Sequence, residues 1–257
     1  MALYICLMSA LIGSTGFVGG HLQENFEFAN KYNRTNISQI QGLDTDLLIC
    51  AGLPAEKWKA NSDPVTDWSN MANLAQMISS VNADKAILIS TIDVYQPPID
   101  VTEDVAPNYN GEGAYGRNRA WFESFFISQF PNTIIIRLPG LFSRNLKKNF
   151  IYDLINNRFD QFSSVNRDSK FQFYDINGIW NLIDSCIENR ISLLNVATEP
   201  ISAQEIASIF DVSLVGSQNK IEYRMKSKHS KVFGGIDGFL QGKAEVLEEI
   251  SKLRHLT

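Results

Sequence analysis

Residues 13–19 read Gly13-Ser14-Thr15-Gly16-Phe17-Val18-Gly19, directly after the apolar run Tyr4–Ile12 and at the start of an amphipathic stretch. In such a loop Gly13 permits a tight turn, Gly16 lets backbone amides approach a pyrophosphate, and Gly19 lets the following helix pack closely on the strand. The amides and the dipole at the start of that helix favour negatively charged phosphates. This order predicts a dinucleotide-binding unit in which all seven residues line the cofactor. The alternative is a glycine-rich turn without a ligand.

Short apolar runs continue along the chain and alternate with segments typical of helices. Runs of this length are typical of strands buried on both faces, and they are Asp46–Ala51, Lys85–Ser90, Thr133–Leu138 and Ser192–Val196. Helices are predicted from Asp63-Pro64 towards Val81, over Tyr115–Phe130, and over Ala203–Phe210 after the capping box Ser202–Glu205. The alternation predicts an α/β fold, a Rossmann-like doubly wound parallel sheet with a small C-terminal substrate region. We assign 1–142 plus 170–198 to the dinucleotide-binding domain and 143–169 plus 199–257 to the substrate region.

Composition describes an ordinary globular chain of 257 residues, with 44% hydrophobic residues and a net charge of −5. That charge argues against nucleic acid or an anionic membrane surface as a partner. The apolar start, Ala2–Ile12, has no basic residues and is too short to span a bilayer, so we expect a cytoplasmic protein. Cys6, Cys50 and Cys186 are far apart in apolar runs, which predicts buried thiols, with no disulfide framework and no metal site.

The end of the second strand should meet the adenosine ribose about 20 residues beyond the glycine loop. Asn33 and Arg34 stand there, and no carboxylate is present to bind the ribose hydroxyls. A guanidinium is suited to a ribose 2′-phosphate, so the sequence favours NADP over NAD. Otherwise Arg34 is an ordinary exposed loop arginine. The 11 residues between Arg34 and Asp46 are too few for a further strand and helix, so we expect at most a stub strand over Ile37–Ile40 and a shallow adenine pocket.

Several motifs resemble those of the extended short-chain dehydrogenases/reductases, which include nucleotide-sugar epimerases, dehydratases and reductases. They are the glycine loop, Cys50-Ala51-Gly52, Ser90-Thr91-Ile92-Asp93-Val94-Tyr95, Glu103–Pro107, Arg137–Phe142 and the late Asn195–Ala207 segment. The resemblance implies an NAD(P) cofactor, with Cys50, Ala51 and Gly52 in its site and Leu138 and Pro139 beside the nicotinamide. It also implies a possible homodimer, because helices that flank the active site often pair in this family.

The catalytic pattern of this family is a Tyr-x-x-x-Lys with an upstream Ser or Thr. Here Tyr115 and Arg119 stand at i and i+4 on one predicted helix face, and Thr91 stands at the end of a predicted strand. The tyrosine exchanges a proton with the substrate oxygen as hydride moves, and a cation one turn away lowers the pKa of the phenol. We therefore assign Thr91 and Tyr115 to the substrate oxygen, and Arg119 to tuning Tyr115 and holding the cofactor ribose. Each of the three has an ordinary structural alternative.

Two departures from the family pattern bear on the chemistry. Arg119 replaces lysine, which keeps the positive charge but does not release a proton, so proton relay and turnover rate are affected more than cofactor binding. Dehydratases of the family carry adjacent Asp and Glu after the threonine, whereas this chain has Ile92 and Asp93. Elimination of water is therefore disfavoured, while reduction, oxidation and epimerisation remain. Asp93 is a candidate acid or base towards the substrate, or a polar residue at the strand end.

A polar cluster follows the sixth-strand motif, where chains of this family enter the substrate region: Arg144, Lys147, Lys148 and Asn149. Cations there suit a nucleotide-sugar diphosphate, and the alternative is a solvated face. The sequence thus predicts an NAD(P)-dependent oxidoreductase or epimerase for a nucleotide-linked sugar. A cofactor-binding sensor or scaffold with little turnover is the second hypothesis, supported by the Lys-to-Arg change and the trimmed adenine side.

Overall fold

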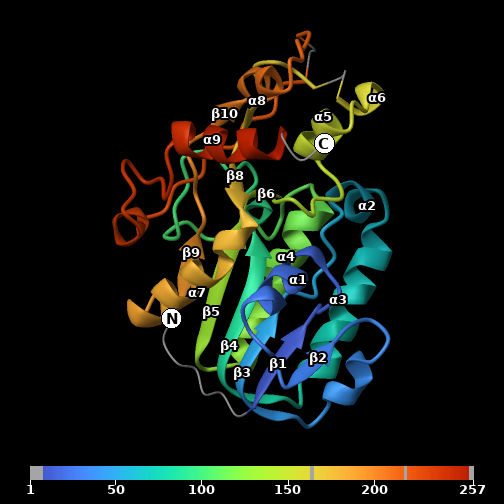
Figure 1. Ribbon diagram of the computed structural model, residues 1–257. Helices are drawn as coiled ribbons and strands as arrows, with labels where there is room; N and C mark the ends of the chain where they lie inside the picture. The colour runs from blue at the N-terminus through green and yellow to red at the C-terminus, as the bar shows by residue number, and fades with distance from the viewer. Residues whose placement is uncertain (1–7, 163–164, 217–218, 255–257) are drawn as a thin grey trace. The chain divides into compact units, whose positions relative to one another are not determined.

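The computed structural model describes residues 8–162, 165–216 and 219–254 (Figure 1). The chain forms two compact units. The first comprises Met1–Gln96, Val105–Arg137 and Ile179–Leu194, and the second comprises Pro97–Asp104, Leu138–Gly178 and Asn195–Thr257.

A six-stranded sheet forms the centre of the first unit. Its order is β2-β1-β3-β4-β5-β9, and the pairs β1·β2, β1·β3 and β3·β4 are parallel. The strands are β1 (Ser9–Ile12), β2 (Asn30–Tyr32), β3 (Asp44–Cys50), β4 (Asn82–Thr91), β5 (Thr133–Leu138) and β9 (Leu193–Asn195). Every residue of β1 is buried, as are the last four of β3, which fits the apolar runs that predicted them. The predicted α/β fold with a doubly wound parallel sheet is confirmed.

Helices cover both faces of this sheet (Figure 1). They are α1 (Phe17–Glu24), α2 (Lys57–Ser62), α3 (Pro64–Ile78), α4 (Ala114–Gln129) and α7 (Ile179–Glu188). Met71 and Ile78 of α3 and Phe122 and Phe126 of α4 lie in one core cluster with sheet residues such as Leu48. On α7, Trp180 donates a hydrogen bond to the Leu22 carbonyl of α1, at 3.0 Å. The side chain of Asp63 caps α3 at Thr66 N, as the Asp-Pro pair predicted.

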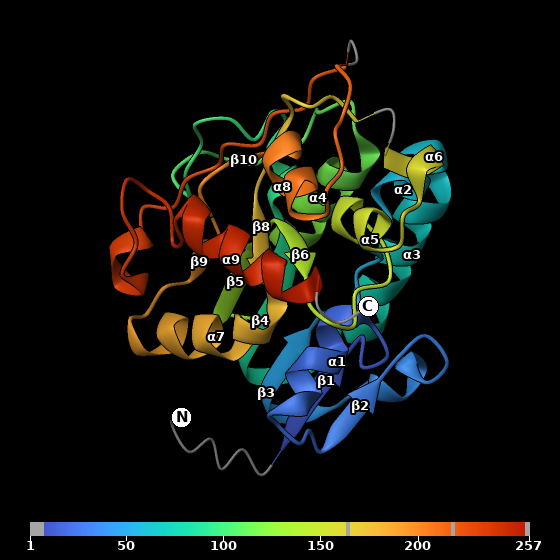
Figure 2. The same ribbon diagram turned by 45° about the horizontal axis from the view of Figure 1, so that its top comes forward.

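The stub strand expected over Ile37–Ile40 is wrong, because this segment is a 3₁₀ helix, η1. The asparagines before it bind their own backbone: Asn33 N donates to Asn36 Oδ1 at 2.7 Å and Asn33 Oδ1 accepts from Thr35 N at 2.8 Å. Such turns compete with extended structure. β2 is the edge strand of the sheet, as Figure 2 shows. Among the described residues no further strand with its helix lies beyond β2, in agreement with the short segment between Arg34 and Asp46.

The second unit has a core of its own around two small sheets. β6 (Gly140–Phe142) pairs with β8 (Phe173–Asp175), and β7 (Lys170–Phe171) pairs with β10 (Ile201–Ser202). Its helices are α5 (Phe150–Ile155), α6 (Phe159–Phe162), α8 (Ala203–Ile209) and α9 (Lys243–Leu253), and its core includes Phe142, Ile151, Ile206 and Ile250. The capping box predicted at the start of α8 is present, with Ser202 and Glu205 binding each other's backbone amides.

The bounds of the two units differ from the sequence assignment. Residues 97–104, 138–142, 170–178 and 195–198 belong to the second unit, whereas we had assigned them to the dinucleotide-binding domain. Pairing explains the difference, because β6 and β7 find their partners within the second unit and Asp100 N bonds Arg224 O there at 2.8 Å.

The remaining expectations concern thiols, metals and membranes. Cys50 and Cys186 are buried and form no disulfide among the described residues, and burial raises the pKa of Cys50 to about 12, while Cys6 lies outside the described residues. Within the described ranges no three His, Cys, Asp or Glu residues are placed to hold a metal ion. None of the helices described is both long and apolar enough to cross a membrane.

Candidate cofactor and catalytic site

Close backbone contacts fix the glycine loop between β1 and α1. Gly13 has a φ of +87°, and a Cβ there would lie 2.4 Å from the Ala51 carbonyl oxygen, so only glycine fits. A Cβ on Gly19 would lie 2.1 Å from the carbonyl oxygen of Gly13, which brings the helix directly against the loop. The turn and packing roles predicted for these two glycines are therefore what the geometry requires.

The start of α1 has the features of a phosphate cradle. Gly16 is the N-cap of α1, and no side chain caps the helix. The first amides of the helix, those of Phe17 and Val18, therefore have no side-chain acceptor. Thr15 and Gly16 are exposed beside them. A Cβ on Gly16 would approach the Gly13 carbonyl oxygen at 3.1 Å, so this position is nearly as restricted. The donor set fits a pyrophosphate, which accepts hydrogen bonds and carries negative charge.

The other predicted cofactor residues of the first unit border this loop. Gly13 N and Ser14 N both donate to the Tyr32 carbonyl, at 2.9 and 3.0 Å, which places Asn33 and the exposed Arg34 directly beyond the loop. On the other side, Ala51 N donates to Ile12 O at 2.9 Å. Cys50 ends β3, and a Cβ on Gly52 would lie 2.8 Å from the Ile12 side chain. Three segments far apart in sequence thus meet at the carboxyl ends of β1, β2 and β3.

Thr91 and Tyr115 are brought together at the end of β4. Thr91 closes that strand, and its hydroxyl accepts from Asp93 N at 3.2 Å to start the short 3₁₀ helix η2 (Ile92–Val94). The first turn of α4 lies directly on η2, since a Cβ on Gly116 would be 1.8 Å from the Asp93 carbonyl oxygen. This contact sets Tyr115 against the strand end, where the Thr91 side chain is near enough to lower the pKa of its hydroxyl.

The pKa of Tyr115 is raised above its ordinary value, and burial is the main cause. Asp93 raises it further, whereas Arg119, the hydrogen bond from Thr91, and Lys57 act to lower it. The phenol is therefore protonated around neutral pH, which suits it to donate a proton to a substrate oxygen.

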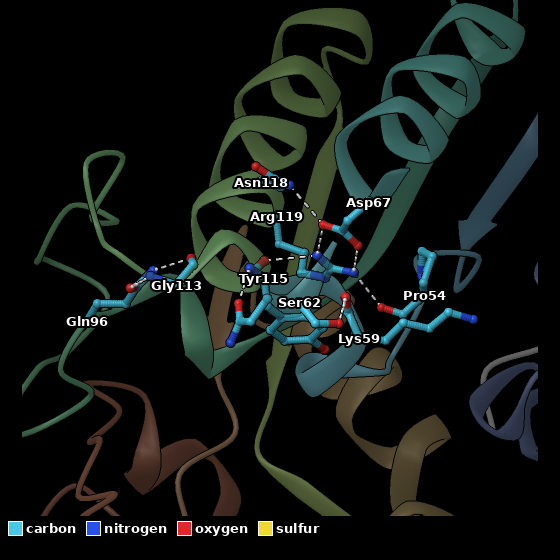
Figure 3. A network of polar contacts seen from close by, with 10 residues as sticks. Pro54, Lys59, Ser62, Asp67, Gln96, Gly113, Tyr115, Asn118 and Arg119 are labelled. Carbon is cyan, nitrogen blue, oxygen red and sulfur yellow. Dashed lines mark hydrogen bonds and ion pairs between the residues drawn. The ribbon is translucent and has the colours of Figure 1, made fainter. Parts of the chain in front are cut away.

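Arg119 is almost fully buried, with 1% of its surface exposed, and its guanidinium lies 3.8 Å from the centre of the Tyr115 ring (Figure 3). It forms a two-pronged ion pair with Asp67 of α3, at 2.7 and 2.9 Å, and also donates to the carbonyls of Pro54 and Tyr115. Asn118 donates to the same carboxylate at 2.9 Å. The predicted neighbourhood of Arg119 and Tyr115 is present. The two Nη atoms of Arg119 donate to Asp67 and to backbone, whereas its buried Nε has no hydrogen-bond partner among the described residues, so its ribose contact stays a prediction.

A second buried ion pair lies behind the site and explains other motif residues. Arg137 of β5 pairs with Glu123 of α4 at 2.6 Å and also donates to the Tyr95 hydroxyl, while Ser90 donates to Glu123 at 2.5 Å. This network ties β4, β5 and α4 together. These motif residues therefore stabilise the end of β4, which carries Thr91, and the end of the neighbouring β5.

Solved structures with the same fold are enzymes of nucleotide sugars. A dTDP-4-dehydrorhamnose reductase from Clostridium acetobutylicum is 18% identical, with 96% of this chain and 100% of that chain covered and a TM-score of 0.72. The Bacillus anthracis dTDP-4-dehydrorhamnose reductase, in complex with NADP, is 18% identical with 97% and 98% covered and a TM-score of 0.73. A UDP-N-acetylglucosamine 4-epimerase from Methanobrevibacter ruminantium, in complex with UDP-N-acetylmuramic acid, is 14% identical with 97% of each chain covered and a TM-score of 0.71. This chain has their fold. No protein-family model and no curated protein sequence matches it.

Two side chains beside the site were not predicted. Asp67 is buried on α3 and neutralises Arg119, and Lys57 of α2 binds the Asp93 carboxylate at 2.6 Å. Neither belongs to a motif. The one signal for Asp67 is its spacing, which places a charged residue on the same helix stripe as the buried Met71, Ala75 and Ile78.

The predicted substrate residues of the second unit have mixed surroundings. Arg144, Lys147 and Lys148 are exposed. Asn149 is the N-cap of α5, where its side chain accepts from Tyr152 N at 3.0 Å and donates to Leu141 O at 2.7 Å. The Asn149 side chain thus stabilises the start of α5. Leu138 and Pro139, at and after the end of β5, are both buried.

Proposed function

We propose that this chain is an NAD(P)-dependent oxidoreductase or epimerase of the extended short-chain dehydrogenase/reductase family, acting on a nucleotide-linked sugar. The observation that carries the proposal is the pairing, in one sheet, of the glycine cradle after β1 with the hydrogen-bonded Thr91 and Tyr115 after β4. Open α/β sheets bind their ligands at the carboxyl ends of the strands. The similar solved structures, named as dTDP- and UDP-sugar enzymes, support the substrate class.

In this proposal the nicotinamide cofactor supplies or accepts the hydride when bound. The residues that hold it are Gly13–Gly19, Asn33, Arg34, Cys50–Gly52, Leu138 and Pro139. Thr91 binds the substrate oxygen and Tyr115 exchanges the proton with it, because the two hydroxyls are already paired and Tyr115 keeps its proton near neutral pH. The exposed Arg144, Lys147 and Lys148 bind the diphosphate.

NADP is the preferred cofactor in this proposal, and Arg34 carries the preference. Arg34 is exposed immediately after β2, beyond the carbonyl that anchors the glycine loop, and no carboxylate stands at 33–36. Arg34→Ala should lower the affinity for NADPH by roughly ten-fold to a hundred-fold, since a charge-assisted hydrogen bond contributes about 1.5–3 kcal/mol, and should leave NADH affinity unchanged. Thermal shift over a range of both cofactors measures the two affinities. An unchanged ratio of affinities contradicts the preference, and the absence of a shift with either cofactor contradicts the proposed function.

The second candidate is a cofactor-binding sensor or scaffold of the same fold. Two observations favour it: the pKa of Tyr115 is raised rather than lowered, and the charge of Arg119 is balanced by Asp67. Such a protein would bind the dinucleotide but would show no hydride transfer that depends on Tyr115.

A homodimer through α3 and α4 is the assembly we propose. Val65 and Trp68 of α3 are 75% and 41% exposed, and the Trp68 ring packs 4.5 Å from that of Trp121 on α4. These residues line one groove, and an exposed apolar patch of this kind marks an interaction surface. Val65→Asp should convert the dimer to a monomer in sedimentation velocity, because it places a charge inside an apolar interface. Val232→Asp, at a residue of the second unit that is 43% exposed, serves as the control. A wild-type monomer at all concentrations contradicts the assembly.

A further inference from the structure

The site as described lacks an obvious way to return a proton to Tyr115. Arg119 contacts the ring, but a guanidinium does not release protons at physiological pH, and its two Nη atoms donate to Asp67 and to the carbonyls of Pro54 and Tyr115. A tyrosine that gives its proton to a substrate oxygen in every cycle needs another source.

A chain of polar contacts runs from Tyr115 in the opposite direction. The Thr91 side chain acts on the Tyr115 hydroxyl, whose pKa it lowers, and Thr91 Oγ1 lies 3.5 Å from Asp93 Oδ2, so its one proton can turn to either neighbour. The other oxygen of that carboxylate, Oδ1, accepts from Lys57 Nζ at 2.6 Å. The side chain of Lys57 is 48% exposed, whereas that of Asp93 is 17% exposed. The chain therefore leads from a buried phenol, through groups of increasing exposure, to an ammonium in contact with solvent.

We propose that Thr91, Asp93 and Lys57 form a proton relay that reprotonates Tyr115. Lys57 supplies the proton that Arg119, at the position of the expected lysine, cannot release. The proposal rests on the proposed function, since a relay is needed only if Tyr115 turns over. Lys57 is a positioning and relay residue, because it acts on the substrate only through the other two.

The transfers balance in the direction of carbonyl reduction. The Tyr115 O–H bond breaks as its proton goes to the carbonyl oxygen of the substrate, while the carbonyl carbon takes the hydride that a bound reduced nicotinamide would supply. The tyrosinate then takes the hydroxyl proton of Thr91. Thr91 takes a proton from the Asp93 carboxyl group, which has received it from the Lys57 ammonium. The neutral Lys57 amine is finally protonated by water. The oxidation direction runs the same transfers in reverse.

The charged groups around Tyr115 come from four elements. Arg119 of α4 and Asp67 of α3 form the closed pair on one side of the ring. Asp93 of η2 and Lys57 of α2 form the second pair, and the second pair alone contains a group that exchanges protons readily with solvent. Loss of Lys57 therefore affects the supply of protons while the Asp67–Arg119 pair stays intact.

Lys57→Met tests the relay, with Lys59→Met as the matched control on the same helix. Lys59 is 64% exposed and its ammonium lies 3.9 Å from Glu56, away from the chain described above. In weakly buffered solution Lys57→Met should lower kcat about ten-fold or more, because proton transfer by a positioned group contributes about 10²–10⁴ to rate. Increasing concentrations of imidazole at constant pH and ionic strength should restore its kcat, whereas the wild type and Lys59→Met should not respond. Lys57→Arg keeps the charge but should behave like Lys57→Met.

Three results would overturn the relay. They are a Lys57→Met kcat equal to that of the wild type, a loss that imidazole does not restore, and full activity of Lys57→Arg, which would assign Lys57 a role of charge or packing alone. Each of these results requires that the wild type is active in the same assay. A wild type that fails to bind either cofactor instead contradicts the proposed function, and one that binds cofactor without hydride transfer contradicts the relay and favours the sensor.

Discussion

Tyr115→Phe is expected to lower kcat by about a hundred-fold to ten-thousand-fold, the range that a positioned general acid contributes. The substitution removes only the hydroxyl that Thr91 binds, and it keeps the ring on which the Arg119 guanidinium lies at 3.8 Å. The fold and the glycine cradle should therefore be unaffected, and the affinity for NADPH should stay within about two-fold because the cradle is built from other segments. Hydride transfer followed by nicotinamide absorbance with a panel of nucleotide sugars measures the loss.

The pH dependence gives the same experiment a second readout. The pKa of Tyr115 is raised in the folded chain, so the protonated form needed for carbonyl reduction persists to alkaline pH, and reduction falls only as pH rises through that raised value. Oxidation, which needs the ionised form, should increase over the same range. Tyr109→Phe is the matched control, because Tyr109 is 47% exposed and its hydroxyl contacts only Ser124 among the hydrogen bonds described. Equal hydride transfer by the wild type and Tyr115→Phe would assign the chemistry elsewhere.

The elements that could be predicted from the sequence are those determined by local pattern. The apolar runs of β3, β4 and β5 lie within buried strands, and the Asp63 cap and the Ser202–Glu205 box start helices at the expected residues. The prediction of a stub strand over Ile37–Ile40 was wrong because this segment is as apolar as a short strand. The asparagine turns before it, which the prediction did not consider, determine its conformation. The bounds of the units failed because they depend on which short strands pair with each other.

The site residues show the same difference between local pattern and long-range pairing. Gly13, Ala51 and Thr91 could be placed because glycine turns and strand ends have local signatures and parallel strands bring their carboxyl ends together. The partners of the charged groups could not be predicted. Asp67 is 52 residues from Arg119 and Lys57 is 36 residues from Asp93, and no spacing rule links residues on separate helices. Arg119 was consequently expected to be a cation available to the cofactor, whereas the structure balances its charge with Asp67.

Asp67→Asn is expected to destabilise the first unit by about 3–5 kcal/mol, the cost of leaving a buried charge without its partner. Arg119 is 1% exposed and Asp67 is 5% exposed, so water cannot replace the lost carboxylate. Asn118 also donates to Asp67, and the single amide oxygen of the variant side chain cannot accept from both Asn118 and the two Arg119 nitrogens in the present arrangement. All four tryptophans, Trp58, Trp68, Trp121 and Trp180, lie in the first unit, so urea unfolding followed by tryptophan fluorescence reports the free energy of unfolding of that unit.

The double variant Asp67→Leu with Arg119→Met separates the charge from the packing. Replacing both members of a buried pair by apolar side chains leaves no unpaired charge, so its loss should be about 2 kcal/mol or more smaller than that of Asp67→Asn. Glu56→Gln, which breaks the exposed Glu56–Lys59 pair at 3.9 Å in the same unit, should cost less than about 1 kcal/mol and controls for the removal of a carboxylate. If the double variant is as unstable as Asp67→Asn, the pair stabilises α3 against α4 through its hydrogen bonds rather than by neutralising Arg119. If the double variant is more stable than Asp67→Asn, as expected, the fold does not need the buried charge of Arg119. That charge is then retained for Tyr115, whose ring it covers, and Arg119→Met alone should raise the pKa of that phenol further.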